Sequence, residues 1–158
     1  MDGINTTNKA TEVFNDLCTT LDNRNWKYKK FPEDLVISFV SMGDDLPMEF
    51  VIIVDEERQI IRILSPILIE DNKNNRLDMA IAACAASYGL SDGSFDYNIV
   101  NGELFFRLTA SFRNSKIGEG LFAYLIACSG LIVDKYNEKF FALSKGILSL
   151  EDFLNIEG

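Results

Sequence analysis

Histidine is absent from this chain of 158 residues, and cysteine and proline are scarce, with three residues each. Without histidine the chain cannot build a Ser-His-Asp or Cys-His catalytic site, and it lacks the commonest transition-metal ligand. Cys18, Cys84 and Cys128 lie far apart, without the close pairs that a structural zinc site needs. Each lies in an apolar stretch with helical spacing, so we expect free, buried thiols. The sequence therefore predicts no enzyme, no metal site and no cofactor.

Basic residues are also in deficit, since 15 Lys and Arg face 24 Asp and Glu, for a formal net charge of −9. Binding of nucleic acid through phosphate neutralisation needs a concentrated basic face, which this balance argues against. Nine of the acids fall between Phe31 and Glu70, where only Arg58 and Arg62 oppose them. We expect an acidic rim that either aids solubility or orients a basic partner.

Long apolar runs and targeting signals are missing too. The longest uncharged run, from Gly120 to Val133, has fourteen residues, well short of the ~20 that a membrane-spanning helix needs. The N-terminal stretch is polar and has no basic segment followed by an apolar core, as a secretory signal would. The chain is therefore expected to be cytoplasmic, with no membrane partner.

The strongest local structural signal lies between Ser94 and Phe112. Asn101-Gly102 is typical of a two-residue hairpin loop, because a type I′ turn needs positive φ at both central residues. Apolar residues alternate with polar ones on both sides of this pair, which predicts antiparallel strands with one buried face; they are Phe95, Tyr97, Ile99, Leu104, Phe106 and Leu108. A two-residue loop pairs residues whose numbers sum to 203 and so places Asp96 opposite Arg107.

In the rest of the chain, helical and extended segments follow one another, and no Pro/Ser/Gly-rich linker separates them. We therefore expect one domain over residues 1–158. A basic connection, 26–30, should follow the first helix. The second helix should bury a stripe of Leu77, Ala80, Ile81, Cys84 and Tyr88 and end at Gly89 in a left-handed cap. The predicted elements are a helix at 9–25, strands at 35–42, 48–54 and 59–64, a helix at 76–88, the hairpin, a long helix at 116–145 and a short helix from Ser149.

The long helix is predicted to supply the main core. Its regular apolar stripe consists of Phe122, Ile126, Ser129, Val133, Tyr136, Phe140 and Leu143. Between Leu121 and Val133 the helix is apolar on nearly every face, which is more than a single sheet would cover. Either the other helices of the chain or a second subunit must hide this surplus. The candidate interface residues are Leu121, Phe122, Leu125 and Ile132.

The predicted order is α-β-β-β-α-β-β-α, an α+β fold with helices packed on an antiparallel sheet. The residues that carry a family resemblance span nearly the whole chain: Pro47-Met48-Glu49-Phe50, Asp78-Met79-Ala80, Phe95-Asp96-Tyr97 with Asn101-Gly102, and Ser149-Leu150-Glu151-Asp152-Phe153-Leu154. The order resembles the fold of class I type III secretion chaperones. The chain more specifically resembles the YbjN-type family of bacterial sensory transduction regulators, which shares that fold. The resemblance implies frequent homodimers and protein partners, and it brings no catalytic or ligand residues.

We therefore expect a non-enzymatic protein-binding module, chaperone-like or regulatory, that acts as a homodimer. An extended partner segment would dock on exposed apolar surface and add hydrogen bonds along a sheet edge. The alternative is a small apolar ligand bound between the long helix and the sheet, which an unfilled pocket there would favour. An enzyme would require an unusual site of converging Asp and Glu side chains.

Overall fold

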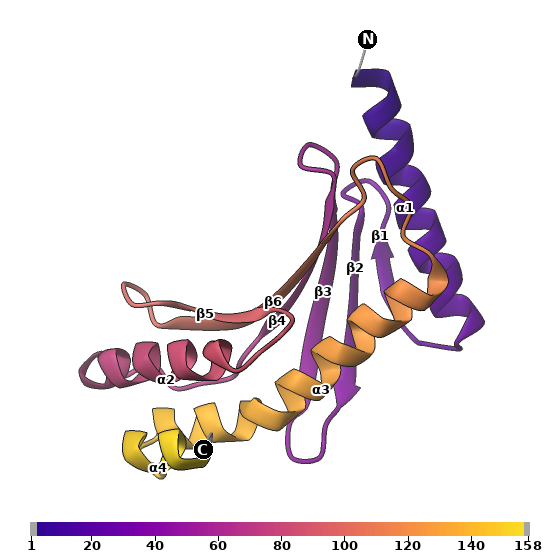
Figure 1. Ribbon diagram of the computed structural model, residues 1–158. Helices are drawn as coiled ribbons and strands as arrows, with labels where there is room; N and C mark the ends of the chain where they lie inside the picture. The colour runs from indigo at the N-terminus through magenta and orange to yellow at the C-terminus, as the bar shows by residue number, and fades with distance from the viewer. Residues whose placement is uncertain (1–2, 157–158) are drawn as a thin grey trace.

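The computed structural model describes residues 3–156, which form a curved sheet with helices packed against it (Figure 1). The elements are α1 (Gly3–Asn23), β1 (Lys29–Phe31), β2 (Val36–Met42), β3 (Pro47–Asp55), β4 (Ile60–Pro66), the 3-10 turn η1 (Lys73–Asn75), α2 (Arg76–Tyr88), β5 (Ser94–Asn98), β6 (Glu103–Ser111), α3 (Glu119–Ser144) and α4 (Leu150–Ile156).

The six strands form one antiparallel sheet in the order β1-β2-β3-β4-β6-β5. The predicted α+β class is confirmed, and so is the meander, which forms β2, β3 and β4. The hairpin joins the meander through β6, where Leu108 lies opposite Ile63 of β4. β1 falls in a segment that was predicted to be a connection. It has only three residues, two of them lysines, a composition common on exposed sheet edges.

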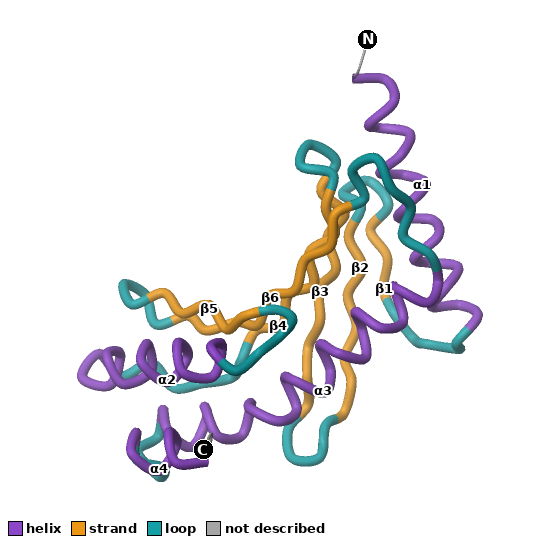
Figure 2. The backbone as a smooth tube through the Cα atoms, in the orientation of Figure 1, coloured by secondary structure: helices purple, strands orange, loops and turns teal. Residues whose placement is uncertain are grey.

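The core lies on one face of the sheet, where the helices of the described chain pack. On β3, Phe50 and Ile52 are buried, whereas Val51 and Ile53 point to the other face and are half-buried. Figure 2 shows α3 crossing the strands, with α1 near one end and α2 and α4 near the other. The predicted stripe of α3 is confirmed, since all of its members are buried: Phe122, Ile126, Ser129, Val133, Tyr136, Phe140 and Leu143.

The C-terminal half of α3 anchors an aromatic cluster. The ring of Phe140 lies 5.0 Å from that of Phe95 on β5 and 5.1 Å from that of Phe153 on α4, measured between ring centroids. Tyr136 lies one helical turn earlier, 5.2 Å from Phe95. Aromatic pairs at such distances in tilted arrangements stabilise beyond their buried area. The cluster therefore ties the hairpin, α3 and α4 together.

The hairpin loop is longer than predicted. Asn98 pairs with Glu103 and Phe95 with Phe106, so paired residue numbers sum to 201 rather than 203. The predicted register is wrong, and four residues, 99–102, connect the strands. Among the described residues of this loop, only Gly102 has positive φ, at +79°, which excludes a type I′ turn. Asp96 and Arg107 still form an ion pair at 2.9 Å, but as diagonal rather than directly opposite neighbours.

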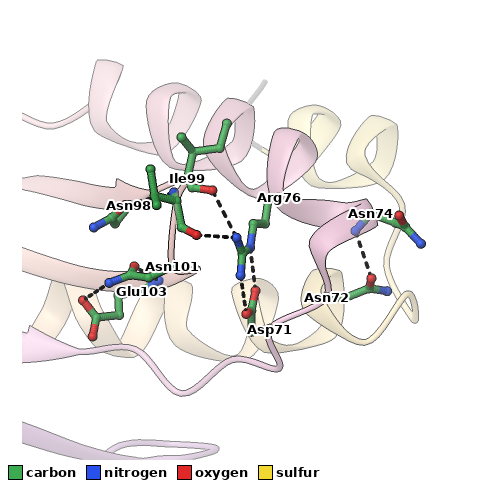
Figure 3. A network of polar contacts seen from close by, with 9 residues as sticks. Asp71, Asn72, Asn74, Arg76, Asn98, Ile99, Asn101 and Glu103 are labelled. Atoms are coloured by element: carbon green, nitrogen blue, oxygen red, sulfur yellow. Dashed lines mark hydrogen bonds and ion pairs between the residues drawn. The ribbon is translucent and has the colours of Figure 1, made fainter.

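Contacts from outside the hairpin select the longer loop (Figure 3). Arg76, at the start of α2, donates hydrogen bonds to the carbonyls of Ile99 and Val100. It is held by Asp71 through two bonds of 2.9 and 2.6 Å, which keep the pKa of Asp71 below its ordinary value. Within the hairpin, the Asn98 side chain accepts a further bond from the Val100 N–H at 3.0 Å. Arg76 and Asp71 lie outside the hairpin, so the residue pattern of the hairpin alone could not predict the longer loop.

Gly102→Ala is expected to destabilise the protein by at least about 1–2 kcal/mol, the cost of left-handed backbone for an L-residue. A methyl group there would lie 2.2 Å from Oδ1 of Asp71, so the Asp71–Arg76 pair would also have to shift. The control is Gly120→Ala, because a Cβ at this helical position meets nothing within 4 Å. Urea denaturation should show a lower midpoint for the first variant and an unchanged or higher midpoint for the second.

α2 packs with the opposite face from the one predicted. Its buried residues are Met79, Ala82, Ala83 and Ala86, whereas Leu77 and Tyr88 are 64% and 94% exposed. The small alanines allow close approach to β5, where the Ser87 hydroxyl accepts a hydrogen bond from the Phe95 N–H at 2.8 Å. Both faces of this helix are apolar, so hydrophobicity alone does not choose between them. Close packing selects the alanine face, because small side chains let the helix approach the sheet and gain more van der Waals contact per residue.

Three predicted helix ends can be compared with the structure. Gly89 has a right-handed conformation with φ −82°, so the predicted left-handed cap is wrong. α3 begins at Glu119 rather than at residue 116, and Gly118, which precedes it, supplies no side-chain cap. At α4 the predicted start is confirmed, since the Ser149 hydroxyl accepts a hydrogen bond from the Asp152 N–H at 3.0 Å.

Candidate functional site

Metal-ligand clusters, cysteines and candidate membrane helices can be compared with the sequence predictions. No cluster of three or more Cys, Asp or Glu side chains within residues 3–156 is placed to hold a metal ion. Cys18 is buried and Cys128 is half-buried, but Cys84 is exposed on α2, against the prediction of buried thiols. Within residues 3–156, no helix combines the length and the hydrophobicity that a membrane span requires.

The structure separates the four candidate interface residues of α3. Phe122 and Leu125 lie in the core of the single chain, with exposed fractions of 1% and 5%. Leu121 is exposed, and Ile132 is half-buried. The apolar surplus of this helix is thus covered in part within one chain. A direct contact of Leu121 and Ile132 with a second subunit or a partner protein stays a prediction.

Two further side chains of α3 are exposed on the surface that includes Leu121. Leu131 is the more open of them, at 74%. Tyr124 donates a hydrogen bond to the Asp92 carboxylate, which raises the pKa of Tyr124 to about 12. Tyr124 is therefore tied to the loop before β5, and Leu131 is the free apolar contact point on this side of the helix.

The outer face of α2 is an exposed apolar stripe formed by Leu77, Ile81, Cys84 and Tyr88. These residues recur at intervals of three and four and lie opposite the buried alanine face. No charged residue occurs between Met79 and Tyr88. An uncharged apolar helix face is typical of a protein contact. The sequence contained this stripe but assigned it to the core, because nothing local marked the other face as closer packing.

β2 has an open edge over its second half. β1 pairs only with residues 36–38 of β2, so residues 39–42 have no strand on their outer side within the described chain. Val40 and Met42 are 67% and 75% exposed here. An open strand edge flanked by apolar side chains can accept an extended segment as an added strand.

A cleft of about 440 Å³ opens between this region and α3. Its lining includes Met48, Ile67 and Val133, which are buried core residues, and Val40 and Leu68, which are exposed. The cleft is therefore apolar both in its depth and around its mouth. This is the place, between the long helix and the sheet, where an unfilled pocket would favour the alternative of a small apolar ligand.

Asn137 brings an unsatisfied hydrogen-bond donor to this cleft. The residue is only 4% exposed and lines the cleft beside Val133. Its Oδ1 accepts a hydrogen bond from the Glu138 N–H at 2.7 Å, whereas its Nδ2 is buried without an acceptor among the described residues. Leaving such a donor unpaired costs about 1–3 kcal/mol. Sequence reasoning missed this residue, because an asparagine inside a helix carries no local signal of its partner.

Carboxylates crowd one end of the cleft. Glu49 lines it, and the β2–β3 turn docks on α3 through a 2.9 Å hydrogen bond from the Asp44 N–H to Asp134. Beside this contact, the Asp45 carboxyl shares a hydrogen bond with Glu138 and raises the pKa of Glu138. A like-charged pair of this kind favours a bound proton or a nearby cation and opposes an anion. Of the nine acids of the predicted rim, Glu49 lines this cleft and Asp44 and Asp45 lie in the turn beside it, whereas Asp55, Glu56 and Glu57 lie at the turn between β3 and β4.

A second apolar cleft, of about 530 Å³, lies on the other side of the segment that follows β4. The two clefts share Pro66, Ile67 and Ile69 in their linings. Val51 and Leu64, from the second face of the sheet, also line this cleft. Apolar surface is therefore continuous from the β2 edge around to the hairpin.

No family model matches the chain, and no curated protein matches it either. Solved structures do share its architecture. A chain from the crystal structure of the ExsC–ExsE complex is similar with a TM-score of 0.57 at 10% identity, over 84% of this chain and 95% of that one. A chain from the HopA1–SchA chaperone–effector complex gives 0.55 at 9% identity, over 79% and 91%. The fold is secretion-chaperone-like. At such identity the likeness shows architecture alone.

Proposed function

We propose that this protein is a non-enzymatic protein-binding module, chaperone-like or regulatory, that acts as a homodimer. The observation that carries the proposal is the similarity of its fold to a chain of a chaperone–effector complex. The exposed apolar side chains at the open edge of β2 support it. The narrower assignment to YbjN-type sensory regulators rests on the sequence motifs.

The partner-binding surface is proposed to be the open edge of β2 with its flanking clefts. An extended segment would gain main-chain hydrogen bonds along residues 39–42 and bury apolar side chains beside Val40 and Met42. The acidic residues around Glu49 would set the orientation and choice of partner more than the affinity.

The dimer surface is proposed to be the outer face of α2. This stripe is uncharged from Met79 to Tyr88, and α2 packs on β5, at the opposite end of the strand order from β1 and β2. A two-fold pairing of this helix with its copy would bury Leu77, Ile81 and Tyr88 on both sides. The exposed surface of α3 around Leu121, Leu131 and Ile132 is the competing location.

A small apolar ligand is the second candidate, favoured by the cleft of about 440 Å³ between α3 and the sheet. Its size suits a small-molecule site. The surrounding carboxylates restrict such a ligand to neutral or cationic compounds, since an anion would be repelled.

The test is affinity purification of the tagged protein from its native cell, followed by binding measurements with the recovered partner. We expect a protein that binds the wild type and the Ile147→Glu variant equally, because Ile147 is 77% exposed and outside these clefts. Val40→Glu should weaken the binding at least tenfold, because it puts a charge on the open edge. Native mass spectrometry that finds a small molecule in place of a protein would favour the second candidate.

A further inference from the structure

The cleft beside α3 combines features that together specify an occupant. The Asn137 amide is the only side chain in the described chain, apart from Arg62, that has a buried donor without an acceptor. Its oxygen is already engaged by the Glu138 N–H. The amide is therefore held with its nitrogen free, and an occupant that reaches it must supply an acceptor oxygen.

Apart from Glu49, the rest of the lining is apolar, so the acceptor must belong to a largely apolar group. Met48, Ile67 and Val133 are buried around the amide, and Val40 and Leu68 stand at the mouth with exposed fractions of 67% and 66%. A group that presents an acceptor oxygen next to apolar atoms fits this distribution. A backbone carbonyl next to an apolar side chain is such a group, and so is the carboxyl end of a fatty acid.

The charges around the cleft decide between these two. Glu49 lines it, and Asp134 and Glu138 occupy the neighbouring turns of α3. The Asp45 and Glu138 carboxyl groups share a hydrogen bond, which raises the pKa of Glu138. A carboxylate ligand would add one more negative charge to these carboxylates. A peptide carbonyl is neutral, and a Lys or Arg beside it would neutralise part of the negative charge around the cleft.

The strand edge supplies the path for a peptide. Val40 lines this cleft and also a neighbouring one of about 470 Å³, whose lining includes Tyr28 and Lys29 at the start of β1. A segment that extends the sheet along residues 39–42 would run past both clefts. Its alternate side chains would point to the same face, as strand geometry requires.

We propose that Asn137 is a peptide-recognition residue, whose Nδ2 donates a hydrogen bond to a backbone carbonyl of an extended partner segment. An apolar side chain of that segment fills the cleft, and a basic residue beside it faces Glu49. This inference rests on the protein-binding function proposed above. It explains why a donor that is unpaired in the free chain is kept in an apolar lining: the group is satisfied on binding.

The probe is a phage-displayed library of random 12-residue peptides, selected on the wild-type protein. We expect enriched peptides with an apolar residue next to Lys or Arg. The strongest peptide, labelled with fluorescein, should bind Asn137→Leu at least tenfold more weakly by anisotropy. The thermal midpoint of this variant should be equal to or above that of the wild type, because the unpaired donor is gone. Asn74→Leu, an exposed position on η1 outside the cleft, should change neither quantity.

A direct readout is the side-chain NH₂ resonance of Asn137, identified by its loss in Asn137→Leu. Peptide binding should shift it downfield, as a new hydrogen bond requires. Equal peptide affinity for the wild type and Asn137→Leu would overturn the inference, and so would a lowered thermal midpoint, which would assign Asn137 to the fold. Selection of no peptide above a Val40→Glu background, or binding of laurate in the cleft, would overturn the peptide as occupant. If Val40→Glu abolishes binding of the native partner and Asn137→Leu does not, the proposed protein-binding function is supported, and the role of Asn137 is rejected.

Discussion

Phe140→Ala is expected to lower the free energy of unfolding by about 3–5 kcal/mol, the range for truncating a fully buried phenylalanine. Phe140 has 0% exposure and packs against Phe95 of β5 and Phe153 of α4. The cavity left by the ring would be walled by three separate elements, none of which can close it alone. Denaturation in urea, followed by circular dichroism, measures the loss.

Phe122→Ala should cost a comparable amount, since this ring is 1% exposed at the other end of α3. The matched control is Glu138→Ala, an exposed position two residues before Phe140. Removing this charge leaves no cavity, so its effect should remain within about 0.5 kcal/mol. If all three variants unfold at the same urea concentration, α3 does not supply the core.

Ile81→Glu is expected to convert the proposed homodimer into a monomer, raising its dissociation constant at least ~100-fold. The two-fold symmetry would place both new carboxylates in one apolar contact, where like charges cost several kcal/mol. Because Ile81 is 40% exposed on the free chain, the monomer itself should fold normally. Sedimentation equilibrium at several concentrations gives the constant, and circular dichroism checks the fold.

Leu131→Glu is the paired control, since Leu131 is exposed on α3 rather than α2. It should leave the dimer unchanged. Dissociation by Leu131→Glu but not by Ile81→Glu would move the interface to α3, beside Leu121 and Ile132. A wild-type protein that sediments as a monomer at all concentrations would remove the homodimer from the proposed function.

The hairpin shows where sequence patterns lose resolution. Side chains alternate with a period of two, so registers that differ by two residues bury the same residues, including Phe95 and Phe106. The alternation therefore predicted the buried face correctly for Phe95, Leu104, Phe106 and Leu108, whereas Ile99 lies in the loop and is exposed. It left the register to the turn chemistry of Asn101-Gly102. The turn preference of Asn101-Gly102 was overridden by Arg76, which donates hydrogen bonds to the carbonyls of a longer loop and is itself held by Asp71. Both residues lie more than twenty positions away in the chain.

α2 shows the same limit for helices. Its bounds, Arg76–Tyr88, agree with the prediction, because helix formation depends on local propensity and spacing. The face that α2 buries does not agree with the prediction. Both of its faces are apolar: one carries alanines, and the other carries Leu77, Ile81 and Tyr88. The face that packs is the one that permits the closest approach to β5, and the sequence contains no measure of that distance.

By itself the sequence determined the α+β class, the order of the main elements, the buried stripe of α3 and the absence of histidine-based chemistry, because these depend on composition and on short-range periodicity. Tertiary structure alone decided which apolar surfaces remain exposed: Phe122 and Leu125 went into the core, whereas Ile81 and Val40 stayed outside. It also brought Asn137 to a cleft with Val40 and Glu49, residues that are far apart in the chain. Exposure and convergence are properties of contacts between distant segments, and the candidate binding surfaces consist of such contacts.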